Sequence, residues 1–131
     1  MNTVTVDELF ADLRRSNTFF SCSARRKRDK KVDGVVVEPS GTIYTRTYRL
    51  NVPATKKEAE RRLPPGQRRE EDYANGVITA YDVTATDKHG EKGDFRRINL
   101  EGVVQVRAKG KIWTPYYNRE DRQWYLVEVQ Q

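Results

Sequence analysis

The chain begins with apolar residues at helical spacing. Leu9, Phe10 and Leu13 fall on one stripe, at intervals of three and four residues. The four residues Thr5–Glu8 have the order of a capping box, in which the threonine hydroxyl and the glutamate carboxylate each bond a free backbone N–H. The pattern predicts a short helix over residues 5–15 that places one face on a core.

From residue 18 onward, apolar and polar positions alternate as they do in half-buried strands. The alternating segments are bounded by glycine, proline and polar turns, and they cover 18–27, 42–52, 77–84, 95–100, 103–108, 112–117 and 123–129. No βαβ order separates them, so the strands should pair antiparallel. We therefore predict an all-β fold, a small β-barrel or sandwich, whose core includes Phe20, Leu50, Ile98, Leu100, Val104 and Val106.

Two stretches interrupt this alternation. Residues 28–41 are polar and basic, contain the run Val35–Val37, and should connect the first two strands as a hairpin. Residues 53–72 carry a second capping box and a short helical pattern that ends at Pro64–Gly66. This second stretch has little to bury, so we expect an exposed, basic helical insertion.

The length of 131 residues is that of one domain, which we expect to span 1–131, with 114–131 as a C-terminal extension strand. The net charge is +6, and it is unevenly placed. Residues 1–70 hold 16 Lys and Arg against 9 Asp and Glu, whereas residues 71–131 hold 9 against 10. This asymmetry indicates either a phosphate-bearing partner or a solubilising face.

Candidate catalytic groups are few. The single cysteine, Cys22, lies on the apolar face of a predicted strand, and the single histidine, His89, lies in a glycine-containing turn. A disulfide framework, a zinc finger and the common nucleotide-binding or hydrolase motifs are excluded, so we expect neither an enzyme nor a cofactor. No apolar run is long enough to span a membrane, and the acidic N-terminus does not suit a signal peptide. A soluble, cytoplasmic setting is expected.

Basic residues interleaved with aromatics on strands are the remaining signal. Proteins that bind single strands combine Lys and Arg against the phosphates with exposed rings against the bases. The alternative is that most of the rings build the core. The candidate rings are Tyr44, Tyr48, Trp113, Tyr116, Tyr117, Trp124 and Tyr125. We select as ligand-binding candidates Arg25, Arg26, Arg46, Arg49, Arg61, Arg62, Arg68, Arg69, Arg96, Arg97 and Trp113.

Several strand motifs resemble a known family. They are Phe19-Phe20, Gly41-Thr42, RTYRLNV at 46–52, VITAYDV at 77–83, FRRINL at 95–100 and EGVVQVRAKGKIW at 101–113. In this order they resemble the WYL-like phage proteins that have a Sm-like SH3 β-barrel fold. The resemblance implies an SH3/Sm-like barrel, a binding module rather than a catalyst, and a phage-encoded protein in the bacterial host cytoplasm. Residues 28–41 and 53–72 are longer than the family pattern, and 114–131 adds a strand.

Two functions from different classes follow from these features. The first is binding of a nucleic acid or a nucleotide through basic and aromatic strand residues. The alternative is a phage accessory or anti-defence protein that binds and inhibits a host protein. An exposed sheet edge at Gln123–Val129 would suit either β-augmentation with a partner or formation of a homo-oligomer.

Overall fold

The computed structural model describes residues 2–50, 72–86, 90 and 92–129. Every strand pairing in this part of the chain is antiparallel, which confirms the prediction of an antiparallel all-β protein. The elements are β1 Thr3–Thr5, α1 Val6–Ser16, β2 Phe20–Arg25, β3 Lys30–Val32, β4 Val35–Glu38, β5 Ile43–Arg49, β6 Val77–Thr86, β7 Lys92–Asn99, the 3₁₀ turn η1 Leu100–Gly102, β8 Val103–Ala108, β9 Lys111–Asn118 and β10 Gln123–Val129.

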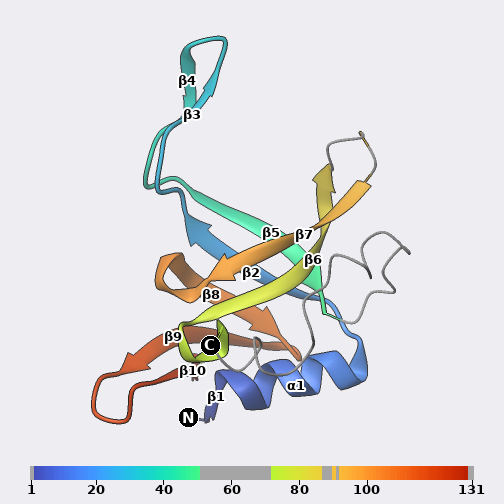
Figure 1. The fold of residues 1–131 in the computed structure, drawn as a ribbon, viewed down its shortest axis with the longest axis vertical. Helices are drawn as coiled ribbons and strands as arrows, with labels where there is room; N and C mark the ends of the chain where they lie inside the picture. The colour runs from blue at the N-terminus through green and yellow to red at the C-terminus, as the bar shows by residue number, and fades with distance from the viewer. Residues whose placement is uncertain (1, 51–71, 87–89, 91, 130–131) are drawn as a thin grey trace.

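Eight of these strands form one sheet in the order β1-β10-β9-β8-β2-β5-β6-β7 (Figure 1). The expectation of a barrel is corrected by this order, because no ladder between described residues joins the end strands β1 and β7. After η1 the chain runs in β8 beside β2, not along the outer side of β7. The described sheet is therefore open.

Helix α1 packs on the core through the face that its spacing predicts. Thr5 caps the helix, and its Oγ1 accepts a hydrogen bond from the N–H of Glu8 at 3.1 Å. The buried residues of the helix are Val6, Leu9, Phe10 and Leu13. The ring of Phe10 meets that of Phe20 on β2 edge to face, at 5.3 Å between centroids. This contact links the helix to the middle of the sheet.

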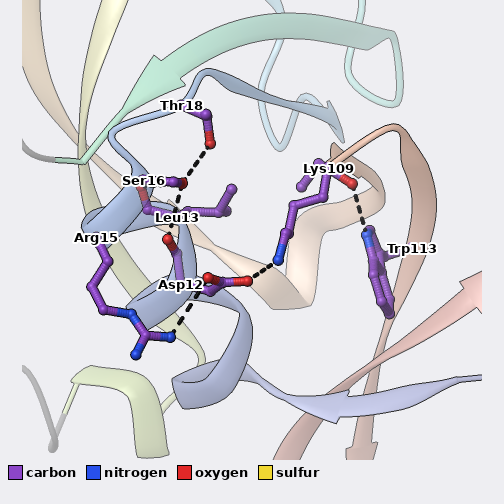
Figure 2. Close-up of polar contacts among 8 residues, drawn as sticks. Asp12, Leu13, Arg15, Ser16, Thr18, Lys109 and Trp113 are labelled. Carbon is purple, nitrogen blue, oxygen red and sulfur yellow. Dashed lines mark hydrogen bonds and ion pairs between the residues drawn. The ribbon is translucent and has the colours of Figure 1, made fainter.

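Polar contacts also hold α1 against the turn between β8 and β9 (Figure 2). Lys109, in that turn, forms an ion pair with Asp12 of the helix, and Arg15 lies 3.5 Å from the same carboxylate. At the end of the helix, the hydroxyls of Ser16 and Thr18 are 2.9 Å apart. Because the β8–β9 turn is 97 residues from Asp12, these contacts could not be inferred from local pattern.

Five of the six predicted core residues are buried, namely Phe20, Leu50, Ile98, Leu100 and Val106. The prediction for the sixth residue, Val104, is wrong, because Val103 is buried instead. The register between β2 and β8 shifts at Ser23/Ala24, so that Ser23 lies opposite Gln105 but Ala24 lies opposite Val103. This irregularity adds one residue to β8, and strict alternation fails there.

The connection between β2 and β5 contains structure that alternation did not predict. Strands β3 and β4 form a separate two-stranded sheet, which is called the ribbon below. Its turn is Asp33-Gly34, with φ of 51° and 80°, the positive values that a tight two-residue hairpin requires. Figure 1 shows the ribbon standing away from the main sheet, at the opposite end of the molecule from α1.

Strand β10 corrects the expectation of a free edge at Gln123–Val129. It pairs with β9 on one side and with β1 on the other, where Thr3–Thr5 lie opposite Tyr125–Val127. The N–H of Glu128 also donates to the carbonyl of Asn2 at 2.8 Å. The three-residue strand β1 is too short for alternation to reveal, and it covers the middle of β10.

Two further features bear on the expectations from sequence. The predicted insertion 53–72 lies outside the described residues, apart from Asp72. Among the helices that the structure describes, none has both the length and the apolar character needed to cross a membrane.

Candidate functional site

A pocket of about 470 Å³ opens where the end of β2 and the start of β5 approach the end of β7. Apolar and aromatic residues contribute one part of its wall, and cationic residues contribute another. The first group is Cys22, Ala24, Tyr44, Tyr48, Ile98 and Val103. The second is Arg25, Arg26, Lys27, Arg28, Lys30 and Arg97. Below, this cavity is called the basic pocket.

The β2–β5 hairpin positions the cationic wall. The N–H of Arg26 donates a hydrogen bond to the carbonyl of Thr42 at 2.9 Å, and the carbonyl of Arg26 accepts one from the N–H of Gly41 at 2.8 Å. The ladder therefore continues one step beyond β2. Next along the chain, the carboxylate of Asp29 accepts from the N–H of Ser40 at 2.7 Å. These bonds hold the backbone of 26–29 beside the pocket.

Tyr44, on the aromatic part of the wall, contacts two arginines. The guanidinium carbon of Arg26 lies 5.0 Å from the centroid of its ring, and that of Arg46 lies 5.6 Å away. Both distances are within the range of a cation–π contact. Arg26 also forms an ion pair with Glu38 of β4, so its side chain is held by two partners.

The electrostatics of the basic pocket favour an anion. Six cationic residues line it, against the single acid Asp29. Arg26 is paired with Glu38, and Arg97 is paired with Asp72 at 3.1 Å. Within the described ranges, the remaining four cations make no ion pair, and they are Arg25, Lys27, Arg28 and Lys30. Their positive charge is available to a ligand.

The thiol and the phenol on the pocket wall are neutral near pH 7. Burial raises the pKa of the Cys22 thiol from 9.0 to about 12. Burial also raises the pKa of Tyr48, with smaller contributions from the neighbouring Cys22 and Asp82. A thiol with a raised pKa is a poor nucleophile, since the thiolate is the reactive form. These two groups therefore form an uncharged part of the pocket wall.

The structure gathers three of the predicted ligand-binding residues at the pocket, namely Arg25, Arg26 and Arg97. Arg46 reaches the pocket only through Tyr44, and its guanidinium lies 3.5 Å from the carboxylate of Asp82. Asp82 is wholly buried, and it also accepts from the N–H and the hydroxyl of Thr84. Arg46 thus balances a buried charge.

Other predicted arginines lie elsewhere. Arg49 lies over the ring of Phe19, at 5.2 Å. Arg96 does not line the pocket, and it pairs with Asp94 of its own strand at 3.0 Å. The remaining four fall outside the described residues, and they are Arg61, Arg62, Arg68 and Arg69.

Trp113 requires a correction. The sequence pattern selected its ring as a surface for a base, but the residue is only 4% exposed. Its indole N–H donates to the carbonyl of Ala108 at 3.2 Å (Figure 2). The ring is part of the core and has no free face, so we remove it from the candidate site.

Three pocket residues were missing from the selection, namely Lys27, Arg28 and Lys30. They lie in residues 1–70, the part of the chain with the excess of cations, yet the charge pattern alone does not indicate which cations share a cavity. Among the residues that the structure describes, no group of three or more His, Cys, Asp or Glu side chains could hold a metal ion.

Comparisons of the chain with protein-family models, with curated proteins and with solved structures gave no match.

Proposed function

We propose that this protein is a non-enzymatic binding module for a phosphate-bearing nucleotide unit, either free or within a nucleic acid. The observation that carries the proposal is the basic pocket, in which four cations without an ion pair in the described chain lie beside an aromatic and apolar wall. This combination suits a ligand that has both negative charge and a flat apolar part. A nucleotide has both.

The dimensions and chemistry of the pocket support this choice. Its volume of about 470 Å³ lies within the range of small-molecule sites, roughly 300–1,000 Å³. Arginine and lysine bind phosphate through charge-assisted hydrogen bonds, and arginine can do so with two parallel bonds. Tyr44 offers aromatic surface at the same place, whereas Tyr48 is a core residue. We assign the phosphate to Arg25 and Arg28, and the base to Tyr44.

Resemblance to the WYL-like phage proteins supports further proposals about origin and type. We propose that the open sheet belongs to the SH3/Sm-like type, that residues 1–131 act as one domain, and that the protein works in the cytoplasm of a phage-infected bacterium. The short helix followed by antiparallel strands is compatible with that type. A single cooperative transition of the whole chain in urea, coincident for two spectroscopic probes, would support the single domain.

Neutralising the pocket cations tests the proposed function. The double variant Arg25→Gln/Arg28→Gln removes two charges that make no ion pair with any described residue. Its affinity for a labelled oligo(dT) should fall, and the slope of log K against log salt should flatten by about 0.7 for each lost phosphate contact. Fluorescence anisotropy at several salt concentrations measures both quantities. ATP in the same assay separates a free nucleotide from a polymer.

A matched control exists in the β9–β10 turn. Arg119→Gln/Arg122→Gln removes the same number of charges from exposed positions outside the pocket. This control should leave the salt slope near that of the wild type. Equal slopes for the two double variants would contradict the proposal, because the charge effect would then come from the whole protein. Absence of saturable binding below about 100 µM, the weak end of non-specific binding, would also contradict it.

A further inference from the structure

The ribbon exposes valines that do nothing for the core. Val32, Val35, Val36 and Val37 are 50%, 64%, 44% and 52% exposed. Val32 lies directly opposite Val35 beside the turn, and Lys31 lies opposite Val36. Because paired residues of two strands project from the same face, Val32 and Val35 form an apolar pair at the tip. Exposed β-branched residues on a projecting hairpin indicate a contact surface.

The base of the ribbon carries more cations than acids and is continuous with the basic pocket; Asp29 is the acid on the pocket wall, and Glu38 is paired with Arg26. Lys30 begins β3 and also lines the pocket, as do Lys27 and Arg28 just before it. A ligand that follows these cations out of the pocket arrives at the valines. Its binding chemistry would change along this path, from phosphate contacts at the base to apolar contacts at the tip.

Area and charge argue against a second copy of the chain as the occupant. Four half-exposed valines offer on the order of 300 Å² of apolar surface, whereas each partner in a standard protein interface buries about 800 Å². Pairing two ribbons through β3 would also set Lys30 and Lys31 near their counterparts. A polyanion avoids both difficulties, since Lys27, Arg28 and Lys30 at the base can supply much of the affinity for phosphates, whereas Asp33 lies at the tip and Glu38 is paired with Arg26.

We propose that the ribbon binds duplex DNA, with its two strands lying in the major groove and the Val32–Val35 pair against the base edges. The strands of a two-stranded ribbon are about 4.8 Å apart, and the B-DNA major groove, about 12 Å wide, admits such a ribbon. The deep, narrow major groove of duplex RNA does not. Valine methyls can contact the methyl groups of thymine in the major groove. This inference rests on the proposed function and selects a polymer over a free nucleotide.

The first test changes the tip without changing charge. Val32→Thr/Val35→Thr keeps the branched shape and the strand preference, and it removes apolar contact at the pair. We expect affinity for a 20-base-pair DNA duplex to fall by about tenfold, with the salt slope unchanged. ATP binding in the pocket should be unaltered. Val129→Thr, at an exposed position on β10, is the control and should leave all three values unchanged.

The second test removes most of the ribbon. Lys30 and Glu38 are cross-strand partners, so Asn-Gly in place of residues 31–37 would join them through a tight turn. This variant retains Lys30 at the pocket and the Glu38 partner of Arg26. Its urea midpoint should stay close to the wild-type value because the ribbon valines are exposed. Its preference for duplex DNA over duplex RNA should disappear.

The outcomes separate the two proposals. If Arg25→Gln/Arg28→Gln weakens binding but both ribbon variants bind duplex DNA normally, the ribbon inference is wrong and the pocket stands. If Arg25→Gln/Arg28→Gln has no effect on any ligand, the proposed function fails first. Equal affinity of the wild type for DNA and RNA duplexes would overturn the groove assignment. So would a wild-type dimer, or binding to anionic vesicles, that Val32→Thr/Val35→Thr abolishes.

Discussion

Replacing Trp113 tests directly which of two roles its ring has. The sequence pattern assigns the ring to a ligand surface, whereas the structure buries it in the core. A ring that stacks on a base should be dispensable for folding, whereas a core ring should not. In the structure Trp113 lies on β9 between Val106 of β8 and Glu128 of β10, and it is 4% exposed. Two variants separate volume from hydrogen bonding: Trp113→Ala removes both, and Trp113→Phe removes chiefly the indole N–H.

The expected loss of stability follows from burial. A buried tryptophan covers up to about 250 Å², which at about 25 cal/mol per Å² sets an upper bound near 6 kcal/mol. Tryptophan-to-alanine changes in cores cost about 3–5 kcal/mol. Trp113→Phe should cost about 1–3 kcal/mol, since the carbonyl of Ala108 loses the donor that lies 3.2 Å away. A small domain has roughly 5–15 kcal/mol of stability in all.

Urea unfolding followed by circular dichroism measures the free energy of unfolding. With a slope of about 2 kcal/mol per M, typical for a small protein, Trp113→Ala should lower the midpoint by about 2 M. Tyr116→Ala is the matched control, because this neighbouring aromatic of β9 is 53% exposed. Its free energy of unfolding should change by no more than about 0.5 kcal/mol.

Two results would refute this reasoning. An unchanged midpoint for Trp113→Ala would show that the ring is not part of the core. Folded Trp113→Phe that has wild-type stability but has lost oligonucleotide binding would show that the indole contacts the ligand. The expected result is a less stable protein whose folded fraction binds with normal affinity.

Three further predictions concern the interior. Arg46→Gln and Asp82→Asn should each lower the free energy of unfolding by about 2–4 kcal/mol, with a coupling above about 1 kcal/mol in a double-mutant cycle, because Asp82 is wholly buried and Arg46 lies 3.5 Å away. Iodoacetamide at pH 8 should label Cys22 only in the unfolded chain, because the thiol is buried in the folded protein. Burial raises the pKa of the thiol from 9.0 to about 12, so the unfolded chain loses this proton at a lower pH than the folded protein. The free energy of unfolding should therefore fall between about pH 9 and pH 12, and the part of this fall that is due to Cys22 should be absent in Cys22→Ala. Gly76→Ala should cost about 1–3 kcal/mol in thermal or urea unfolding, because its φ is +72° and a Cβ would lie 2.6 Å from the ring of Trp124; an unchanged midpoint would contradict that geometry.

Much of the secondary structure could be predicted from sequence because its causes are local. The threonine cap and the apolar stripe are within one segment, and α1 occupies Val6–Ser16 against the expected 5–15. The predicted strands 103–108 and 123–129 coincide with β8 and β10. The alternation of apolar and polar residues indicates which side of a strand is buried, and turn residues indicate where the strand ends. The same signals paired β2 with β5 as a hairpin.

The candidate site could be predicted only in part. The charge distribution pointed to residues 1–70, and the selected Arg25 and Arg26 of that half do line the basic pocket. Charge along the chain could not show that Arg97 reaches the same pocket from β7, or that Arg46 is held by Asp82. An arginine beside a buried carboxylate and an arginine beside a cavity look alike in sequence. Their difference lies in neighbours that are tens of residues away.

Tertiary structure alone decided the register of β8, the pairing of β1 with β10 and the burial of Trp113. For the register of β8 and the pairing of β1, the deciding contact joins segments that are far apart in the chain. The irregularity opposite Ser23/Ala24 exchanges Val103 for Val104, although the sequence of β8 alternates on either side of it. An aromatic side chain on a strand can face either the core or a ligand, and only packing against other strands and the helix fixes which. Local sequence sets the period of burial, and long-range packing selects the residues that become the surface.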